Sequence, residues 1–241
     1  MAKKKSQRVI IREYIKMRNR VIKLSYAEYK KPFNYLLQKM AKSEQFFFEK
    51  DWQEFNKLLS AGFTKSNVIS FQEITKFYTG VYGFKSKKEK KLIEVIQNKA
   101  LEEYSKKHVA KKVKTITKTT QKRINKIVTD GQSAGKNRKD IAKELVNSIQ
   151  GMKKNRAMTI ARTESANSTS YINHSSLSEL GLKRKWVHVG GGKTDRAEHV
   201  ACDNEVIEDK EIYSCGLSYP HEPGADPGDV INCYCLEIMA I

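Results

Sequence analysis

The sequence predicts an α+β protein, with a basic helical module over residues 1–110 and a smaller α+β domain over residues 111–241. Apolar residues recur at helical spacing in the first part, whereas alternating, strand-like segments follow Gly181. Charge is also divided unequally along the chain. Residues 1–150 hold 36 Lys and Arg and 14 Asp and Glu, whereas residues 151–241 hold 10 Lys and Arg and 13 Asp and Glu. All four cysteines lie in the second part, at positions 202, 215, 233 and 235.

Composition narrows the class of protein. A chain of 241 residues with 39% hydrophobic residues is long and apolar enough to bury a core. Mean hydropathy is −0.63, and no apolar run approaches the roughly 20 residues that a membrane-spanning helix needs. We therefore expect no membrane partner. The first residues, Met1 to Lys5, do not form the apolar stretch of a secretory signal, which indicates synthesis in a cytoplasm.

The positive charge predicts a polyanionic partner. Residues 1–150 carry a net charge of +22, compared with +19 for the whole chain. A basic module without a membrane anchor attracts nucleic acid, so we expect it to bind double-stranded DNA without sequence preference. A solvated, lysine-rich helical surface without a ligand is the alternative. The candidate contacts are Lys85, Lys87, Lys88, Lys90, Lys91, Lys111, Lys112 and Lys114.

The helical segments follow from apolar spacing and from turn residues. Helices are predicted over residues 8–30 and 33–60, interrupted at Pro32, with a turn at Gly62. A helical hairpin follows, in which Gly135 opens the turn and Asn137 caps the second helix. The last helix covers about residues 155–180 and stops at Gly181.

Glu164 lies on the apolar side of this last helix. A carboxylate that faces a core needs a hydrogen-bond partner or a cation. Arg162 lies about 200° around the helix from Glu164, so the partner has to come from elsewhere in the fold. Asn232 or a backbone N–H of the C-terminal tail is the candidate.

Strand-like segments follow Gly181. Residues 183–189 alternate, with Trp186 and His188 on one face, and residues 205–207 and 236–238 are further short strands. Residues 216–229 hold three prolines and are predicted to form an irregular loop.

A structural motif runs through the second half of the chain and comprises Arg162-Thr163-Glu164, Gly181, Trp186, Asp195-Arg196-Ala197-Glu198-His199 and Asn232-Cys233-Tyr234-Cys235. Taken in order, these features resemble the Mu F-like family of phage minor head proteins over about residues 112–238. Two positions depart from the family pattern. Asn204 ends a turn where relatives usually have glycine, and asparagine tolerates the left-handed conformation. Tyr234 stands where relatives usually have arginine.

The resemblance implies a structural role in the virion. Members of this family are minor capsid proteins at or near the portal vertex, which act in procapsid assembly and in the handling of packaged DNA. The implied partners are the portal protein, a scaffolding or major capsid protein, and DNA. The implied locations are the capsid interior or portal vertex, and the host cytoplasm during assembly. The alternative function is that of a non-specific cytoplasmic DNA-binding protein.

His199, Cys202, Cys233 and Cys235 offer four ligands of the kind that a structural zinc takes. The Cys-x-Cys spacing is tighter than usual, and Cys202 occupies an apolar position of the family turn. We therefore expect no cofactor, and favour buried thiols with a histidine bonded inside the loop core. A structural zinc, or a disulfide of Cys235 with Cys233 or Cys202, is the alternative. The tail is expected to pack toward His199 and the Glu164 helix.

No enzymatic activity is expected. The family domain is similar in fold to ADP-ribosyltransferases, and Arg162 with Ser168-Thr169-Ser170 imitates two of their motifs. Here both share one helix, two turns apart, whereas the enzymes place them on separate strands. Their Glu-x-Glu is also absent, since Glu208 and Glu211 are three positions apart. A small polar helix surface is the simpler interpretation of Ser168 to Ser170.

Overall fold

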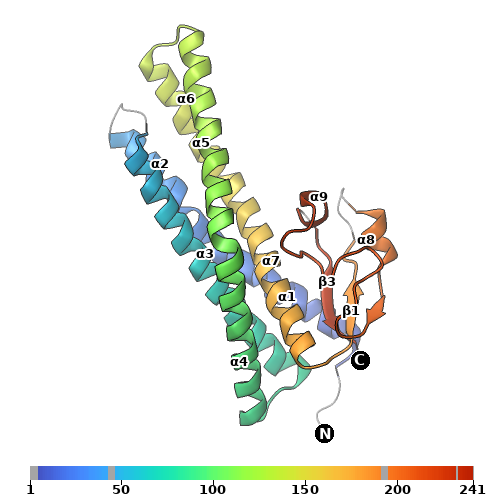
Figure 1. The fold of residues 1–241 in the computed structure, drawn as a ribbon. Helices are drawn as coiled ribbons and strands as arrows, with labels where there is room; N and C mark the ends of the chain where they lie inside the picture. The colour runs from blue at the N-terminus through green and yellow to red at the C-terminus, as the bar shows by residue number, and fades with distance from the viewer. Residues whose placement is uncertain (1–4, 43–46, 191–194, 232, 241) are drawn as a thin grey trace. The chain divides into compact units, whose positions relative to one another are not determined.

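The computed structural model describes residues 5–42, 47–190, 195–231 and 233–240 (Figure 1), and it confirms the α+β class. None of the helices in these residues is long and apolar enough to cross a membrane. The helices are α1 (Gln7–Tyr29), α2 (Lys31–Lys42), α3 (Glu49–Phe77), α4 (Lys87–Tyr104), α5 (Ala110–Ser133), α6 (Arg138–Gly151), α7 (Ala157–Glu179), α8 (Ala197–Ala201) and α9 (Pro227–Val230). The strands are β1 (Arg184–Val187), β2 (Val206–Ile207) and β3 (Leu236–Met239), and short π-helical segments cover Tyr78–Tyr82, Ser105–Val109 and Met152–Arg156.

The chain forms two compact units, each assembled from separate stretches of sequence. The first unit takes in Met1–Ile22, Asn67–Ser105 and Arg162–Ile241, and the second takes in Lys23–Ser66 and Lys106–Ala161. Helices α1, α3 and α7 therefore contribute residues to both units. Residues 110 and 111 both belong to the second unit, so the division into modules 1–110 and 111–241 stays a prediction.

The second unit has a helical core rich in aromatic rings. Phe33 of α2 meets Phe55 of α3 edge-on, with ring centroids 5.5 Å apart. The turn expected at Gly62 is wrong, because α3 runs through this glycine. An added Cβ there would lie 3.5 Å from the ring of Tyr29 and 3.6 Å from the carbonyl oxygen of Glu28. These are ordinary van der Waals distances, so α1 and α3 pack against each other here with room for a Cβ.

The helical hairpin of the second unit is confirmed. The side chain of Asn137 accepts a hydrogen bond of 3.0 Å from the backbone N–H of Asp140, and so caps α6. Gly135 adopts a φ of +67°, which glycine reaches without steric cost. Buried Gly131 of α5 lies directly under Ile141 of α6, because an added Cβ would be 2.7 Å from the Ile141 Cγ1. The hairpin therefore needs a residue without a side chain at this crossing.

The first unit holds the sheet, whose strand order is β2-β1-β3 with both pairs antiparallel. Helix α7 ends where predicted. Gly181 has a φ of +60°, its N–H donates to Ser178, and the N–H of Leu182 donates to Leu177. This left-handed cap turns the chain directly into β1, which pairs with β3 so that Trp186 lies opposite Glu237. The cap thus leads the chain from the α7 helix into the central strand of the sheet.

Candidate functional site

The tail motif meets α8 in a small buried cluster of the first unit. His199 of α8 is 3% exposed, and Cys233 and Cys235, which lead into β3, are 8% and 2% exposed. The Nδ1 of His199 lies 3.6 Å from the Sγ of Cys233 and 3.7 Å from the Sγ of Cys235. Within the described ranges, this is the one group of three His, Cys, Asp or Glu residues whose ligand atoms all lie within 4.8 Å. The expected packing of the tail toward His199 is confirmed.

Several motif residues hold this group in place. The indole of Trp186 meets the His199 ring edge-on, with centroids 5.3 Å apart. Arg196 donates a hydrogen bond of 2.8 Å to the carbonyl of Ile231, which ties the approaching tail to α8. Asn204 has a φ of +69°, so the left-handed turn predicted at this departure from the family pattern is present.

Arg18 fixes the tail from the opposite end of the sequence. It is 5% exposed, and its Nη1 donates to the carbonyl oxygens of Tyr234 and Cys235 at 3.1 and 3.3 Å. Its guanidinium lies 5.7 Å from the centre of the Tyr234 ring. Bonds from a charged donor to carbonyls are stronger than neutral ones, so this contact orients the backbone that carries both tail cysteines.

The structure changes which residues lie beside His199 and the two tail cysteines, compared with the set that the sequence suggested. Cys202 is fully buried in the same cluster, but its sulfur lies 3.2 Å from the Ser214 hydroxyl and accepts from the backbone N–H of Cys215. His188, which follows β1, instead places its Nδ1 3.6 Å from the Sγ of Cys235. All four cysteines are free, so neither of the two disulfides considered as an alternative is formed.

The two tail cysteines share their protons unequally. Hydrogen bonds from Cys235 and from His199 outweigh the opposing effect of burial and lower the pKa of Cys233 to about 3. The same thiol–thiolate bond, together with burial, raises the pKa of Cys235. The geometry therefore favours a thiolate at Cys233 beside a protonated Cys235.

The carboxylate of Glu164 is buried, as predicted, at 8% exposure. The hydroxyl of Tyr104, on α4, donates a hydrogen bond of 3.4 Å to it. A partner from outside the helix is thus confirmed, whereas Asn232 lies outside the described residues. Arg162 is exposed.

The small polar residues that follow on α7 do not form a helix surface, so that interpretation is wrong. Ser168, Thr169 and Ser170 are 0%, 0% and 4% exposed. The hydroxyl of Ser168 lies 2.7 Å from that of Ser70, and Thr169 donates to the carbonyl of Ser165. Packing and hydrogen bonding inside the unit account for these residues.

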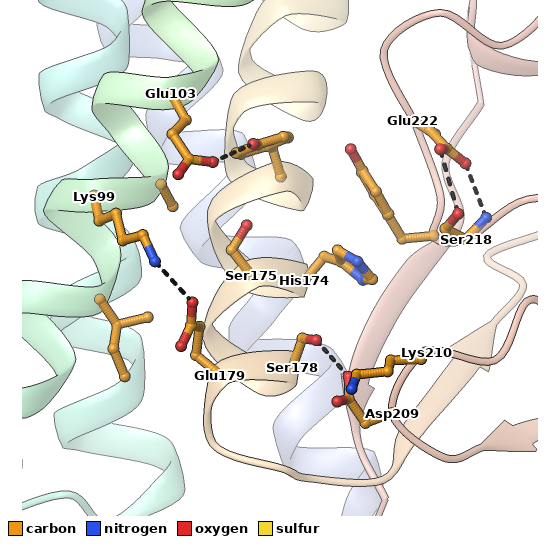
Figure 2. Close-up of a pocket in the computed structure, with 14 residues that line it drawn as sticks. Lys99, Glu103, His174, Ser175, Ser178, Glu179, Asp209, Lys210, Ser218 and Glu222 are labelled. Carbon is orange, nitrogen blue, oxygen red and sulfur yellow. Dashed lines mark hydrogen bonds and ion pairs between the residues drawn. The ribbon is translucent and has the colours of Figure 1, made fainter.

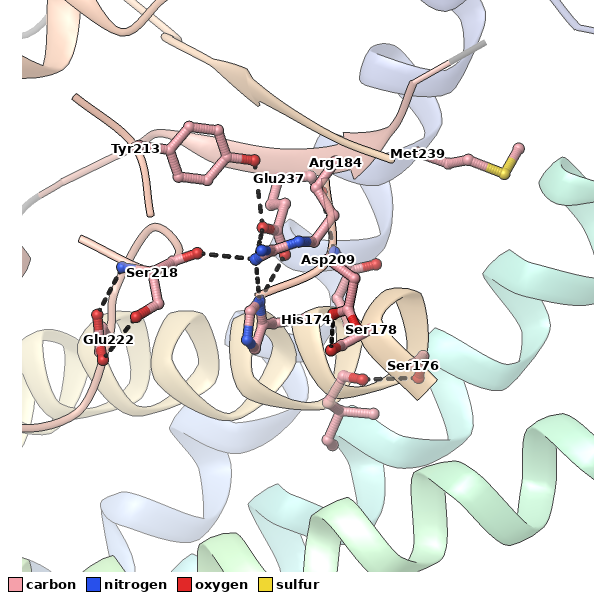
Figure 3. Close-up of polar contacts among 12 residues, drawn as sticks. His174, Ser176, Ser178, Arg184, Asp209, Tyr213, Ser218, Glu222, Glu237 and Met239 are labelled. Atoms are coloured by element: carbon pink, nitrogen blue, oxygen red, sulfur yellow. Dashed lines mark hydrogen bonds and ion pairs between the residues drawn. The ribbon is translucent and has the colours of Figure 1, made fainter. Parts of the chain in front are cut away.

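A second buried polar group was missed in the sequence. Arg184 of β1 and Glu237 of β3 are each 1% exposed and form an ion pair of 3.2 Å (Figure 3). Arg184 also donates to the Nδ1 of His174 at 2.9 Å and to the carbonyl of Ser218 at 3.0 Å, while Tyr213 donates to Glu237 at 3.2 Å. Glu237, a carboxylate between the apolar residues of its strand, was the available signal.

A hollow of about 590 Å³ adjoins this group, between α4, α7 and the loop that follows β2 (Figure 2). The ring of His174 stacks on Tyr219 along its wall, with centroids 4.2 Å apart. Two lysines and four carboxylates line it, and each carboxylate is bonded to a neighbouring residue. These pairs are Lys99 with Glu179, Tyr171 with Glu103, Ser178 with Asp209, and Ser218 with Glu222.

The predicted DNA contacts fall in both units. Lys85, Lys87, Lys88, Lys90 and Lys91 are exposed in and before α4, in the first unit. Lys111 and Lys114 are exposed and Lys112 is half-buried on α5, in the second unit. The second unit holds 24 Lys and Arg against 8 Asp and Glu, which is +16, whereas the first holds 22 against 19, which is +3.

A comparison with models of known protein families indicates the family of this chain. The model of the family described as Phage Mu protein F like protein matches residues 118–238, which is 121 of the 241 residues. Searches of curated proteins and of solved structures found no significant match.

Proposed function

The chain belongs to the Phage Mu protein F like family of phage head morphogenesis proteins, and from this premise we propose that it is a portal-associated minor head protein. In this role it helps to assemble the procapsid and contacts the packaged DNA. Its partners are the portal protein, a scaffolding or major capsid protein, and duplex DNA bound without sequence preference.

The observation that supports DNA contact is a row of lysines along α5. Lysines recur here at intervals of three or four residues, and at about 100° per residue they fall within a sector about 120° wide. All are exposed. We call this row the lysine face of α5, and it comprises Lys111, Lys114, Lys118, Lys122 and Lys126.

The lysine face is free to meet a partner because α5 buries its other side. Val113, Thr117, Thr120 and Ile124 are buried, and they lie about half a turn around the helix from the lysines. From Lys111 to Lys126 the face extends about 22 Å at 1.5 Å per residue. Duplex DNA carries one negative charge per roughly 1.7 Å of its axis, so such a row spans many phosphates.

The DNA contact is tested by measuring affinity for a duplex at rising salt concentration. A variant with Lys111, Lys114, Lys118 and Lys122 replaced by glutamine is compared with the intact chain. We expect weaker binding and a salt slope that falls by about 0.9 for each phosphate that the variant no longer neutralises.

A matched control removes the same charge from the first unit by replacing Lys85, Lys87, Lys88 and Lys91 with glutamine. We expect a smaller reduction in affinity, because this unit has a net charge of only +3. Equal reductions in the two variants would contradict the assignment to α5. No affinity at low salt would contradict DNA contact altogether.

The capsid role is tested by co-expression with the portal protein of the same phage. We expect the two proteins to co-purify in the presence of nuclease, which removes any bridging DNA. Co-purification that disappears with nuclease would favour the alternative, a DNA-binding protein unrelated to capsids.

A further inference from the structure

We propose that His199, Cys233 and Cys235, together with His188, bind one structural zinc ion in the first unit. The first three residues form the buried group described above, and His188 contacts one of its sulfurs. This set differs from the one that the sequence suggested, since His188 takes the place of Cys202.

The distances match a metal centre. Zinc bonds of about 2.3 Å to sulfur and 2.0–2.1 Å to nitrogen, at a tetrahedral angle, place the two ligand atoms about 3.6 Å apart. The Nδ1 of His199 lies 3.6 Å from one sulfur and 3.7 Å from the other. The Nδ1 of His188 lies 3.6 Å from Cys235 but is not among the three atoms that all lie within 4.8 Å of one another, so its ring has to shift toward them to become the fourth ligand. A single N–H of His199 could point at only one of the two sulfurs. A metal ion bound by all three atoms would explain why both sulfurs lie at nearly the same distance from this nitrogen.

His188 supplies the fourth position with an oriented ring. Its side chain is 14% exposed, and its Nε2 lies 3.7 Å from a carboxylate oxygen of Asp195. A carboxylate beside the second nitrogen of a metal-bound histidine fixes the ring and raises its basicity. Asp195 thereby receives a role within the Asp-Arg-x-x-His motif.

The ligand types select zinc among the common ions. Two thiolates and two imidazoles in a buried site suit tetrahedral zinc, and a closed set of four protein ligands is typical of structural sites. Binding one Zn²⁺ to two cysteine thiolates leaves a neutral centre, and any thiol that is still protonated releases its proton to solvent. The ion would join the end of β1, helix α8 and the segment that enters β3.

The experiment uses the full chain, stripped of metal with a chelator and then titrated with zinc or cobalt. We expect one ion per chain, a higher melting temperature, and the thiolate-to-cobalt charge-transfer absorption of two sulfur ligands. Cys235→Ser should lose the ion and this absorption. His188→Ala should weaken binding at least about tenfold, since even an outer partner of a metal ligand is worth roughly 10–100-fold.

Two matched variants serve as controls. Cys202→Ser changes an equally buried cysteine of the same cluster, and serine can keep its hydrogen bonds to Ser214 and Cys215. His221→Asn changes another buried histidine of the unit, at a φ of +65° that asparagine tolerates. Both should bind zinc as the intact chain does.

Failure of the intact chain to bind zinc at equimolar concentration would overturn the proposal, whether or not any variant folds. Loss of binding in Cys202→Ser, or unchanged affinity in His188→Ala, would overturn the assignment of these ligands.

Discussion

The two compact units place their polar groups in opposite ways. The second unit directs a net charge of +16 to its surface, and its interior is dominated by rings and aliphatic side chains such as Phe33 and Phe55. The first unit is nearly balanced at +3, yet it buries Arg184, Glu237 and His199. The second unit therefore carries most of the net charge of the chain, whereas the first unit uses buried charged groups in its packing.

The sharpest test of this contrast is Arg184→Ala. Removing one partner of a buried ion pair leaves the other charge unpaired, so we expect a loss of about 3–5 kcal/mol in the free energy of unfolding. Lys185→Ala, at the neighbouring half-buried position of β1, should cost less than about 1 kcal/mol. Both are measured by chemical denaturation. Equal effects would show that the buried pair does not determine the packing of this unit.

The second unit should instead be sensitive to the shape of its helix crossings. Gly131→Ala forces a Cβ to within 2.7 Å of Ile141, and overpacking of this kind costs about 1–3 kcal/mol. Gly62→Ala is the matched change, because its Cβ meets nothing closer than 3.5 Å. We expect it to stabilise by up to about 1 kcal/mol through helix propensity. Thermal melts of the two variants should therefore shift in opposite directions.

Asp51 is a buried carboxylate of the second unit, and it is therefore an exception to the contrast in buried charge between the two units. Burial raises its pKa, but hydrogen bonds from the Phe48 N–H, the Tyr35 hydroxyl and Lys39 outweigh burial and hold the pKa below the usual value. A lowered pKa stabilises the fold above about pH 4, and this contribution is lost as the pH falls through the lowered value. Asp51→Asn should lower the free energy of unfolding by about 1 kcal/mol at neutral pH, which is the usual contribution of a side chain that caps the N-terminus of a helix.

The measurement for Asp51 is the free energy of unfolding from pH 7 down to pH 3. The difference between Asp51→Asn and the intact chain should shrink toward the acid end. A difference that stays constant with pH would contradict an ionised, stabilising Asp51.

Local patterns explain which parts of the molecule were predictable. The ends of α6 and α7 follow from Asn137 and Gly181, because a cap or a left-handed turn depends on a few adjacent residues. The end of α3 was not predictable from Gly62, because a single glycine is tolerated inside a helix and the packing of the folded chain decides whether the helix continues. Spacing along the chain brought His199 and the tail cysteines into one hypothesis. It could not show that His188 replaces Cys202 beside them.

The ion pair of Arg184 and Glu237 illustrates the same limit. Glu237 interrupts an apolar segment, whereas Arg184 lies between two lysines, and either could equally be an exposed position of an edge strand. Their pairing depends on the register of β1 and β3, which lie about 50 residues apart in the sequence.

The contact of Arg18 with the tail has a consequence for synthesis on the ribosome. The second unit ends at Ala161, whereas the carbonyls that Arg18 needs belong to Tyr234 and Cys235, more than 70 residues later. At roughly 5–20 residues per second, that interval lasts about 4–15 seconds. During it, the basic helical unit has its full sequence, while the N-terminal part of α1 waits for the last segment of its own unit. The nascent chain therefore offers its lysine-rich surface before the tail cysteines exist.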